Sequence, residues 1–267
     1  MTYFQAAILG IVQGLTEFLP ISSTAHLLIG GRLLGHDDPG GVFTVMIQFG
    51  AILAVMWLYR AKIVQVVLGL PSSASARRFA TMIVVAFIPA AVAGVLLEHR
   101  IKSILYYSPG VIGAAFIIGG IVILLVERSR PQPTVTDVDR VPLPTALAVG
   151  ASQAVALIPG VSRSGATLTV AMFLGLRREA AARFVFLLSL PAVLAAAIKE
   201  GMEVSKVGVE GLPVTLFLVG LVVSGVVGYI TVKYFIRYLA GHTLHGFAIY
   251  RLLLAGFTVA WLLARQG

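Results

Sequence analysis

Long apolar runs separated by short polar segments dominate this chain of 267 residues. Six of the runs have close to the ~20 residues that a helix needs to cross a lipid bilayer. They cover residues 41–58, 79–97, 109–126, 180–198, 212–232 and 244–263. The pattern therefore predicts an all-α polytopic membrane protein with six transmembrane helices.

Two further apolar stretches are too long for a single crossing. Residues 3–35 and 144–176 comprise 33 residues each, so either one as a straight helix would be about 50 Å long. Each carries a helix breaker near its centre, Pro20 in the first and Pro159 with Gly160 in the second. We therefore expect two re-entrant helix-loop-helix hairpins, because irregular backbone at membrane depth is tolerated only where protein or a water-filled cavity satisfies it.

The two long stretches also resemble each other at a constant offset of 140 residues. Identical pairs include Gly10 with Gly150, Gln13 with Gln153, Ser22 with Ser162, Leu34 with Leu174 and Gly35 with Gly175. Three predicted spans follow each stretch, which is typical of a protein built from two structural repeats. The chain is therefore predicted to be one integral membrane domain, 1–267, with halves of approximately 1–127 and 141–267.

Composition and charge support a membrane protein. Hydrophobic residues make up 58% of the chain and charged residues 12%, which is too little polar surface to coat a soluble globule. The net charge of +9 would suit a nucleic-acid binder, but the basic residues are spread singly or in pairs between the apolar runs. Membrane topology explains this spacing better, so we expect no nucleic-acid partner. The absence of cysteine excludes disulfides and cysteine-ligated metal sites.

The distribution of Lys and Arg predicts how the chain lies in the membrane. If both hairpins are re-entrant and the six runs cross, twelve of the 20 basic residues fall on one side and six on the other, while Arg163 and Arg251 lie inside apolar segments. The richer side is expected to be cytoplasmic. Both termini then face outward and the hairpins enter from opposite sides. The repeats are therefore predicted to be inverted, and their tips could meet near the midplane.

Charged side chains inside apolar segments are the strongest functional signal. An ionisable group in the bilayer interior costs roughly 2.5–3.5 kcal/mol, so Glu17, Arg163 and Arg251 need partners or a purpose. Glu17 and Arg163 could simply pair with each other across the repeat interface, but intramembrane charges are functional by default. Arg251 could snorkel, bind a carbonyl or line a cavity, and the sequence does not choose among these.

The string PGVSRSGAT at 159–167 is a candidate anion-binding site. Ser162 and Ser164 flank Arg163, and Thr167 follows one helical turn later. If a helix starts here, its free N–H groups, the hydroxyls and the forked guanidinium all point at one place, which is the chemistry that binds phosphate oxygens. A carboxylate ligand would fit too. The hydroxyls could equally be N-caps of the helix, and capping is compatible with ligand binding.

The first stretch offers a nucleophile with a base. Ser22 and Ser23 lie four and three residues before His26, so on a helical turn either hydroxyl could approach the imidazole. The simpler interpretation makes Ser22 to Thr24 an N-cap and His26 a satisfied buried histidine. Gln13 and Glu17, at i and i+4, share a helix face and could together hold a hard cation or a water. One carboxylate makes a weak metal site unless substrate phosphates add ligands.

These motifs resemble those of the BacA/UppP-type undecaprenyl-diphosphate phosphatases. The resemblance rests on QGLTE at 13–17, FLPISSTAH at 18–26 and PGVSRSGAT at 159–167, and it extends over the whole chain in length and segment order. It implies an enzyme of the bacterial inner membrane, with its active site open to the outer face, that removes the terminal phosphate of a C55 polyprenyl diphosphate. The product is the recycled lipid carrier for peptidoglycan synthesis. The resemblance also implies bacitracin resistance and dependence on a divalent cation, Mg²⁺ or Ca²⁺.

Carried over by position, the resemblance assigns catalytic roles to Glu17, Ser23, His26 and Arg163. The residues expected to bind the substrate are Gln13, Ser22, Ser162, Ser164 and Thr167. The first position of the family's acidic motif is Glu or Gln, and here it is Gln13. Glu17 is therefore the one predicted metal ligand, and a site with two carboxylates is in doubt.

The predicted mechanism begins when Arg163 and nearby N–H groups clamp the terminal phosphoryl group. Ser23, deprotonated by His26, attacks phosphorus, and water later hydrolyses the phosphoserine. Direct attack by a water that Glu17 and His26 order is left open. The rival function is a lipid flippase or secondary transporter, because inverted repeats with broken helices are common in transporters. A transporter needs no nucleophile with its base, so the serine and histidine favour hydrolysis.

The partners expected from the sequence are the polyprenyl diphosphate substrate, membrane lipids and a second copy of the chain. A homodimer is suggested by the small residues Gly220, Ser224 and Gly228, which lie four residues apart and permit close helix contacts. Such contacts would form either within one chain or between chains.

Overall fold

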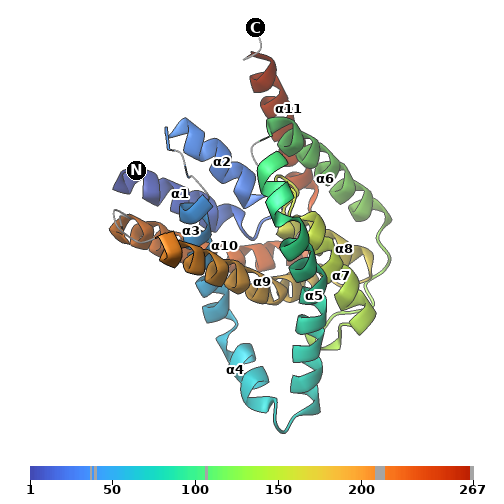
Figure 1. The fold of residues 1–267 in the computed structure, drawn as a ribbon. Coiled ribbons are helices and arrows are strands. Elements are labelled where there is room, and N and C mark those ends of the chain that lie inside the picture. The colour runs from blue at the N-terminus through green and yellow to red at the C-terminus, as the bar shows by residue number, and fades with distance from the viewer. Residues whose placement is uncertain (37, 39–40, 106–107, 208–213, 265–267) are drawn as a thin grey trace.

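The computed structural model describes residues 1–36, 38, 41–105, 108–207 and 214–264, and these ranges are largely helical (Figure 1). The first half contains α1 (Tyr3–Thr16), α2 (Ser23–Leu33), α3 (Val42–Leu58), α4 (Arg60–Gly69), α5 (Ala74–Ile104) and α6 (Pro109–Ser129). The second half contains the short 3-10 helix Val138–Arg140, α7 (Leu143–Val155), α8 (Arg163–Phe173), α9 (Arg178–Val207), α10 (Val214–Gly241) and α11 (His245–Ala264). The predicted all-α fold class is confirmed.

Four helices of the described chain are long and apolar enough to cross a membrane. These segments are Ala74–Leu97 of α5, Pro109–Ser129 of α6, Arg178–Lys199 of α9 and Val214–Gly241 of α10. They correspond to the predicted spans 79–97, 109–126, 180–198 and 212–232, and the first two residues of the last span lie outside the described part. Their length and composition indicate a membrane protein.

The remaining two predicted spans differ from the expectation. The span 41–58 is α3, which has only 17 residues and bends by 73° into α4, so it reaches spanning length only together with that helix. The span 244–263 coincides with α11, whose side chains are described as far as Thr258. The arrangement of six crossings with two re-entrant hairpins therefore stays a prediction.

Both long stretches fold as helix-loop-helix hairpins, as predicted from their central breakers. α1 and α7 begin 140 residues apart, and so do α2 and α8. The residue before α2 and the residue before α8, Ser22 and Ser162, have φ angles of 71° and 72°, a region that residues other than glycine rarely adopt. The offset seen in the sequence thus recurs both in helix boundaries and in an unusual backbone conformation.

The first helix of each hairpin packs against a long helix of the other half. α1 packs along α10, and α7 packs along α5. Glycines make both contacts close: a Cβ on Gly10 would lie 2.7 Å from the carbonyl oxygen of Gly220, and one on Gly150 would lie 1.8 Å from that of Ala86. Each hairpin is therefore held by a long helix of the other half, with backbone against backbone.

The small-residue face of α10 is used inside the chain. Gly220, Ser224 and Gly228 are buried, and the Ser224 hydroxyl donates to the carbonyl of Ile47 in α3 at 2.7 Å. Gly14 of α1 approaches the same face, where an added Cβ would meet the Ser224 carbonyl oxygen at 2.7 Å. This face therefore gives no support to the predicted homodimer.

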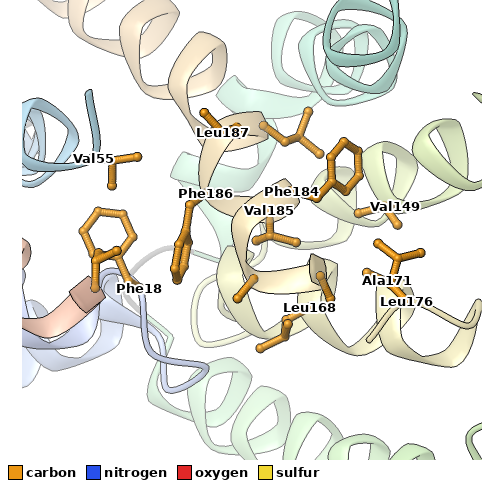
Figure 2. Close-up of a cluster of buried hydrophobic side chains, with 14 of the residues drawn as sticks. Phe18, Val55, Val149, Leu168, Ala171, Leu176, Phe184, Val185, Phe186 and Leu187 are labelled. Carbon is orange, nitrogen blue, oxygen red and sulfur yellow. The ribbon is translucent and has the colours of Figure 1, made fainter. Parts of the chain in front are cut away.

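The main hydrophobic core surrounds the first half of α9. Residues 184–188 of this helix are all buried, as expected for a helix that is packed on every side. Figure 2 shows Phe18, from the loop between α1 and α2, directed toward Phe186 and Val55. The rings of Phe18 and Phe186 meet edge to face, with centroids 5.3 Å apart. The core therefore anchors the first hairpin at the residue next to Glu17.

Candidate active site

The tips of the two hairpins lie against each other. The Ser164 hydroxyl at the start of α8 donates to the carbonyl of Leu19 in the first loop at 2.8 Å. The Arg163 guanidinium forms an ion pair with the Glu17 carboxylate, across 146 positions of sequence. The predicted convergence of the lone acid and the arginine is therefore observed in the structure.

Arg251 of α11 ties the two loops together. It is fully buried, and its two terminal nitrogens donate to four backbone carbonyls. The acceptors are Pro20 and Val161 at 3.2 Å, Gly160 at 3.0 Å and Ala115 at 2.8 Å. Pro20 and Gly160 are equivalent positions of the two repeats, so one side chain joins both tips. Of the three possibilities that the sequence left open for Arg251, carbonyl binding is the one observed.

The Glu17 carboxylate is the centre of the polar network. Its Oε1 accepts hydrogen bonds from Gln48 at 3.0 Å and from Arg163, and its Oε2 accepts from Gln13 at 2.8 Å and from the Ser23 hydroxyl at 2.6 Å. The side chain is only 2% exposed. A carboxylate has about four lone-pair positions, so these donors satisfy it completely. Four charge-assisted hydrogen bonds also fix its orientation.

The structure does not bring His26 to Ser23. His26 Nδ1 donates to the backbone carbonyl of Ser22 at 2.7 Å, and Nε2 lies 2.7 Å from the hydroxyl of Tyr250 in α11. The two rings also stack, with centroids 5.7 Å apart. The expected contact between a serine hydroxyl and the imidazole is therefore replaced, because the charged Glu17 is the stronger acceptor for Ser23 and Tyr250 offers His26 another partner.

The serines and threonine around Arg163 divide between capping and the cavity. α8 begins at Arg163, as predicted, and the Ser162 hydroxyl caps it by accepting from the Gly165 N–H at 3.1 Å. Thr167 donates back to the Arg163 carbonyl at 2.7 Å, while Ser164 binds the other hairpin. The capping interpretation holds for Ser162, and contact of Ser164 and Thr167 with substrate stays a prediction.

A cavity of about 470 Å³ lies over this network. Its polar lining residues are Glu17, Ser22, Ser23, Thr24, Gln48, Gln153, Ser162, Arg163 and Lys199. One wall is apolar and formed by α5 and α9. It contains the small residues Ala90, Ala91, Gly94, Ala192, Ala195 and Ala196 and the larger Phe87, Val95, Ile101 and Val193. Val95, on the same wall, is 85% exposed, so the cavity reaches the outer surface of the helices along α5.

Five of the nine predicted site residues line this cavity, and they are Glu17, Ser22, Ser23, Ser162 and Arg163. The other four, Gln13, His26, Ser164 and Thr167, do not line it. Gln13 and Ser164 still contact the network through Glu17 and the loop of the first hairpin. His26 instead contacts the Ser22 carbonyl and the Tyr250 hydroxyl, and Thr167 donates to the Arg163 carbonyl.

Four polar residues of the cavity were not among the predicted site residues, and they are Thr24, Gln48, Gln153 and Lys199. Gln48 lies in the middle of the apolar run 41–58, where a polar side chain is unusual. Gln153 is the repeat equivalent of Gln13. A search for every polar residue inside an apolar run, uncharged ones included, would have found both glutamines.

The described residues do not form a cation site of their own. They contain no group of three or more His, Cys, Asp or Glu that could hold a metal ion. Among the side chains that the structure describes, Glu17 is the only carboxylate that lines the cavity, and its oxygens already accept four hydrogen bonds. Hard cations such as Mg²⁺ and Ca²⁺ need several oxygen ligands. The predicted cation would therefore depend on substrate oxygens for most of its ligands.

Comparisons with known proteins match nearly the whole chain. The model of the family described as bacitracin resistance protein BacA matches residues 6–257. A relative from Aromatoleum aromaticum is 45% identical over 251 residues, covering 92% of this chain and 90% of its own, and is named undecaprenyl-diphosphatase. One from Cereibacter sphaeroides has the same name and is 38% identical over 265 residues, with 98% and 97% covered. A third, from Burkholderia thailandensis, is named undecaprenyl-diphosphatase 1 and is 42% identical over 266 residues, with 96% and 94% covered.

Proposed function

The chain belongs to the BacA family of bacitracin resistance proteins, and we propose that it carries out its undecaprenyl-diphosphatase reaction in the cavity above Glu17. The enzyme hydrolyses the terminal phosphate of undecaprenyl diphosphate and leaves the monophosphate. One observation carries this proposal: a single cavity combines the Arg163 guanidinium, a Ser23 hydroxyl bonded to a carboxylate, and an apolar wall open to the surface.

The substrate has two chemically different ends, and the cavity matches both. The diphosphate binds at the polar end, where Arg163 and the N-terminus of α8 attract the terminal phosphoryl group. The prenyl chain extends from the polar end along the apolar wall of α5 and α9, where burial of each CH₂ contributes about 0.8 kcal/mol to binding. Alanine and glycine on this wall leave room for a branched prenyl chain.

Ser23 is the proposed nucleophile and Glu17 its proton acceptor. The Ser23 hydroxyl already donates to Glu17 Oε2 at 2.6 Å, so the proton moves to the carboxylate as the oxygen attacks phosphorus. The bond from phosphorus to the bridging oxygen breaks, and undecaprenyl phosphate leaves. Water then hydrolyses the phosphoserine, with the proton of Glu17 returning to Ser23. Direct attack by a water held by Glu17 remains the competing route.

Before the substrate binds, Arg163 is paired with Glu17. An incoming diphosphate carries more negative charge than one carboxylate, so it competes for the guanidinium and draws Arg163 away from Glu17 Oε1. Oε1 then keeps Gln48 as its donor while the Ser23 hydroxyl donates to Oε2. Gln48 and Gln13 keep the carboxylate in place during this exchange.

The decisive assay is phosphate release from a polyprenyl diphosphate by the detergent-solubilised protein, where no compartments exist to transport between. Wild-type protein should release phosphate, and Arg163→Ala and Ser23→Ala should each lose at least about 10²-fold in kcat. No release from any lipid diphosphate would favour the flippase instead. Near-normal turnover by Ser23→Ala would refute the covalent route, and a trapped phosphorylated Ser23 would support it.

His26 has a supporting role in this mechanism, since both of its ring nitrogens are engaged by Ser22 and Tyr250. His26→Gln should therefore retain more activity than Ser23→Ala, because the amide can still bond to its neighbours. If His26→Gln were as inactive as Ser23→Ala while folding normally, His26 would be the base after all.

The divalent cation is expected to enter with the diphosphate. Removal of cations with a chelator should lower phosphate release, and Mg²⁺ or Ca²⁺ should restore it. Calorimetry should detect tight binding of the cation only when a diphosphate is present, because Glu17 alone offers too few ligands. Tight binding without diphosphate would contradict this assignment.

The proposed location is the bacterial inner membrane, with six crossings, inverted repeats and the cavity open to the outer side. The excess of basic residues on one side supports this orientation. Because the chain has no cysteine, a single cysteine introduced near either end can be labelled cleanly in intact cells. Both ends should react with an impermeant reagent added from outside, and protection of both would reverse the proposed orientation.

A further inference from the structure

Gln153 of α7 has a hydrogen-bond donor without a partner. The residue is 4% exposed and lines the cavity, and its Nε2 is buried with no hydrogen-bond partner within the described ranges. A buried amide N–H left without a hydrogen bond destabilises the protein, so such groups call for an explanation. Gln153 lines the cavity, so a rotation of its amide group would bring this donor to a bound substrate.

The repeat explains why this donor is unpaired. Gln13, the equivalent residue of the first half, donates its Nε2 to Glu17 one helical turn later. The position one turn after Gln153 holds Leu157, whose side chain offers no acceptor and lines the same cavity. The second repeat therefore has the glutamine without a carboxylate partner.

Packing keeps Gln153 on the cavity side of the protein. Gly150, one turn earlier, lies so close to α5 that a Cβ would be 1.8 Å from the Ala86 carbonyl oxygen. α7 is thereby pressed against α5, the helix that forms the apolar wall of the cavity. The segment that follows, residues 156–160, also lines the cavity, so this end of α7 leads directly into the loop before Arg163.

We propose that Gln153 is a substrate-binding residue whose Nε2 donates a hydrogen bond to a phosphate oxygen of the bound diphosphate. This proposal rests on the proposed phosphatase function. The two repeats then contribute their glutamines differently, since Gln13 orients the Glu17 carboxylate and Gln153 contacts the substrate. A neutral donor suits this place, because it adds a hydrogen bond to the phosphate without another charge inside the membrane.

The test compares stability with activity in Gln153→Met, which keeps an unbranched side chain and removes the donor. Without ligand, Gln153→Met should melt at the wild-type temperature or above it, because the unsatisfied donor is gone. Its kcat/KM for polyprenyl diphosphate should fall about 10- to 100-fold. Inorganic pyrophosphate should raise the melting temperature of the wild type more than that of the variant. Gln65→Met, at an exposed position of α4, is the matched control and should behave as wild type in all three measurements.

Two further outcomes separate the possible failures. If the wild type is active and Gln153→Met matches it in kcat/KM and in stabilisation by pyrophosphate, the Gln153 proposal is overturned and the phosphatase function stands. If the wild type releases no phosphate, the function itself fails. Gln153→Glu serves as a second variant: it places a negative charge beside the diphosphate and should weaken pyrophosphate stabilisation further, and an unchanged or stronger effect would also overturn the proposal.

Discussion

Replacement of Arg251 by methionine should separate the two hairpin tips. The guanidinium donates to four backbone carbonyls, two of which belong to the equivalent loop positions Pro20 and Gly160. Methionine is of similar length, so it fills the apolar volume but leaves all four carbonyls without this donor. Ser23 and Arg163 lie three residues after those two positions, so loosening of the loops should move both active-site groups.

The structure gives the size of the expected loss. Each hydrogen bond from a charged donor contributes about 1.5–3 kcal/mol, but burial of the guanidinium offsets much of that sum. Breaking a buried hydrogen-bond network places this substitution at the upper end of single-residue effects, with an expected loss of about 3–5 kcal/mol, which is a large part of a usual folding stability of ~5–15 kcal/mol. For a chain of this size, that loss lowers the melting temperature by roughly 6–20 °C.

The assay is thermal unfolding in detergent together with phosphate release below the unfolding temperature. Arg251→Lys should fall between wild type and Arg251→Met, because one ammonium cannot reach four separated carbonyls. Gly119→Ala should act like Arg251→Met, since a Cβ there would lie 2.1 Å from a guanidinium nitrogen. Arg237→Met, on the exposed side of α10, is the control and should change stability by less than ~0.5 kcal/mol. If Arg251→Met melted with the wild type and kept full activity, the guanidinium would not be what joins the loops.

Two further substitutions test the packing between the halves. Gly150→Val should destabilise the protein by more than the ~1–3 kcal/mol usual for overpacking, because its Cβ would lie 1.8 Å from the Ala86 carbonyl oxygen. Gly256→Ala is the control and should be neutral, since nothing lies within 4 Å of an added Cβ. Equal melting temperatures for the two variants would contradict this prediction. Glu127→Gln should lower the free energy of unfolding, measured by chemical denaturation, by about 3–5 kcal/mol. The reason is that the buried carboxylate bonds to Arg178 and to the backbone N–H of Leu244, in the loop before α11. A loss below ~1 kcal/mol would mean that solvent screens the pair.

Much of the fold could be predicted from the order of apolar and polar residues. Helix breakers within runs too long for one span predicted both hairpins, and the offset of 140 residues predicted which segments are equivalent. The bend after α3 was not predicted, because Tyr59 is neither glycine nor proline and the turn there depends on how α4 packs against α5. The extension of α5 to Ala74–Ile104 was missed for a related reason, since a helix does not stop where its apolar run stops.

The candidate site was predicted where chemistry left little choice. A carboxylate and a guanidinium in apolar segments need partners inside the protein, so the convergence of Glu17 and Arg163 could be predicted from their places in the two hairpins. The partner of His26 could not be predicted in this way. Serine, carbonyl and tyrosine oxygens can all satisfy an imidazole, and Tyr250 is 224 positions away in sequence.

The sequence by itself therefore determined which segments are helical, where two of them break, and which charged residues must find partners inside the protein. These features follow from hydrophobicity and local backbone preferences, which act over a few residues. Only the tertiary structure decided that Ser23 bonds to Glu17, that Arg251 joins both loops and that Gln153 faces the cavity without a partner. Those outcomes depend on how α7, α10 and α11 pack against the opposite half, because hydrogen bonds form only between groups that long-range packing brings within about 3 Å.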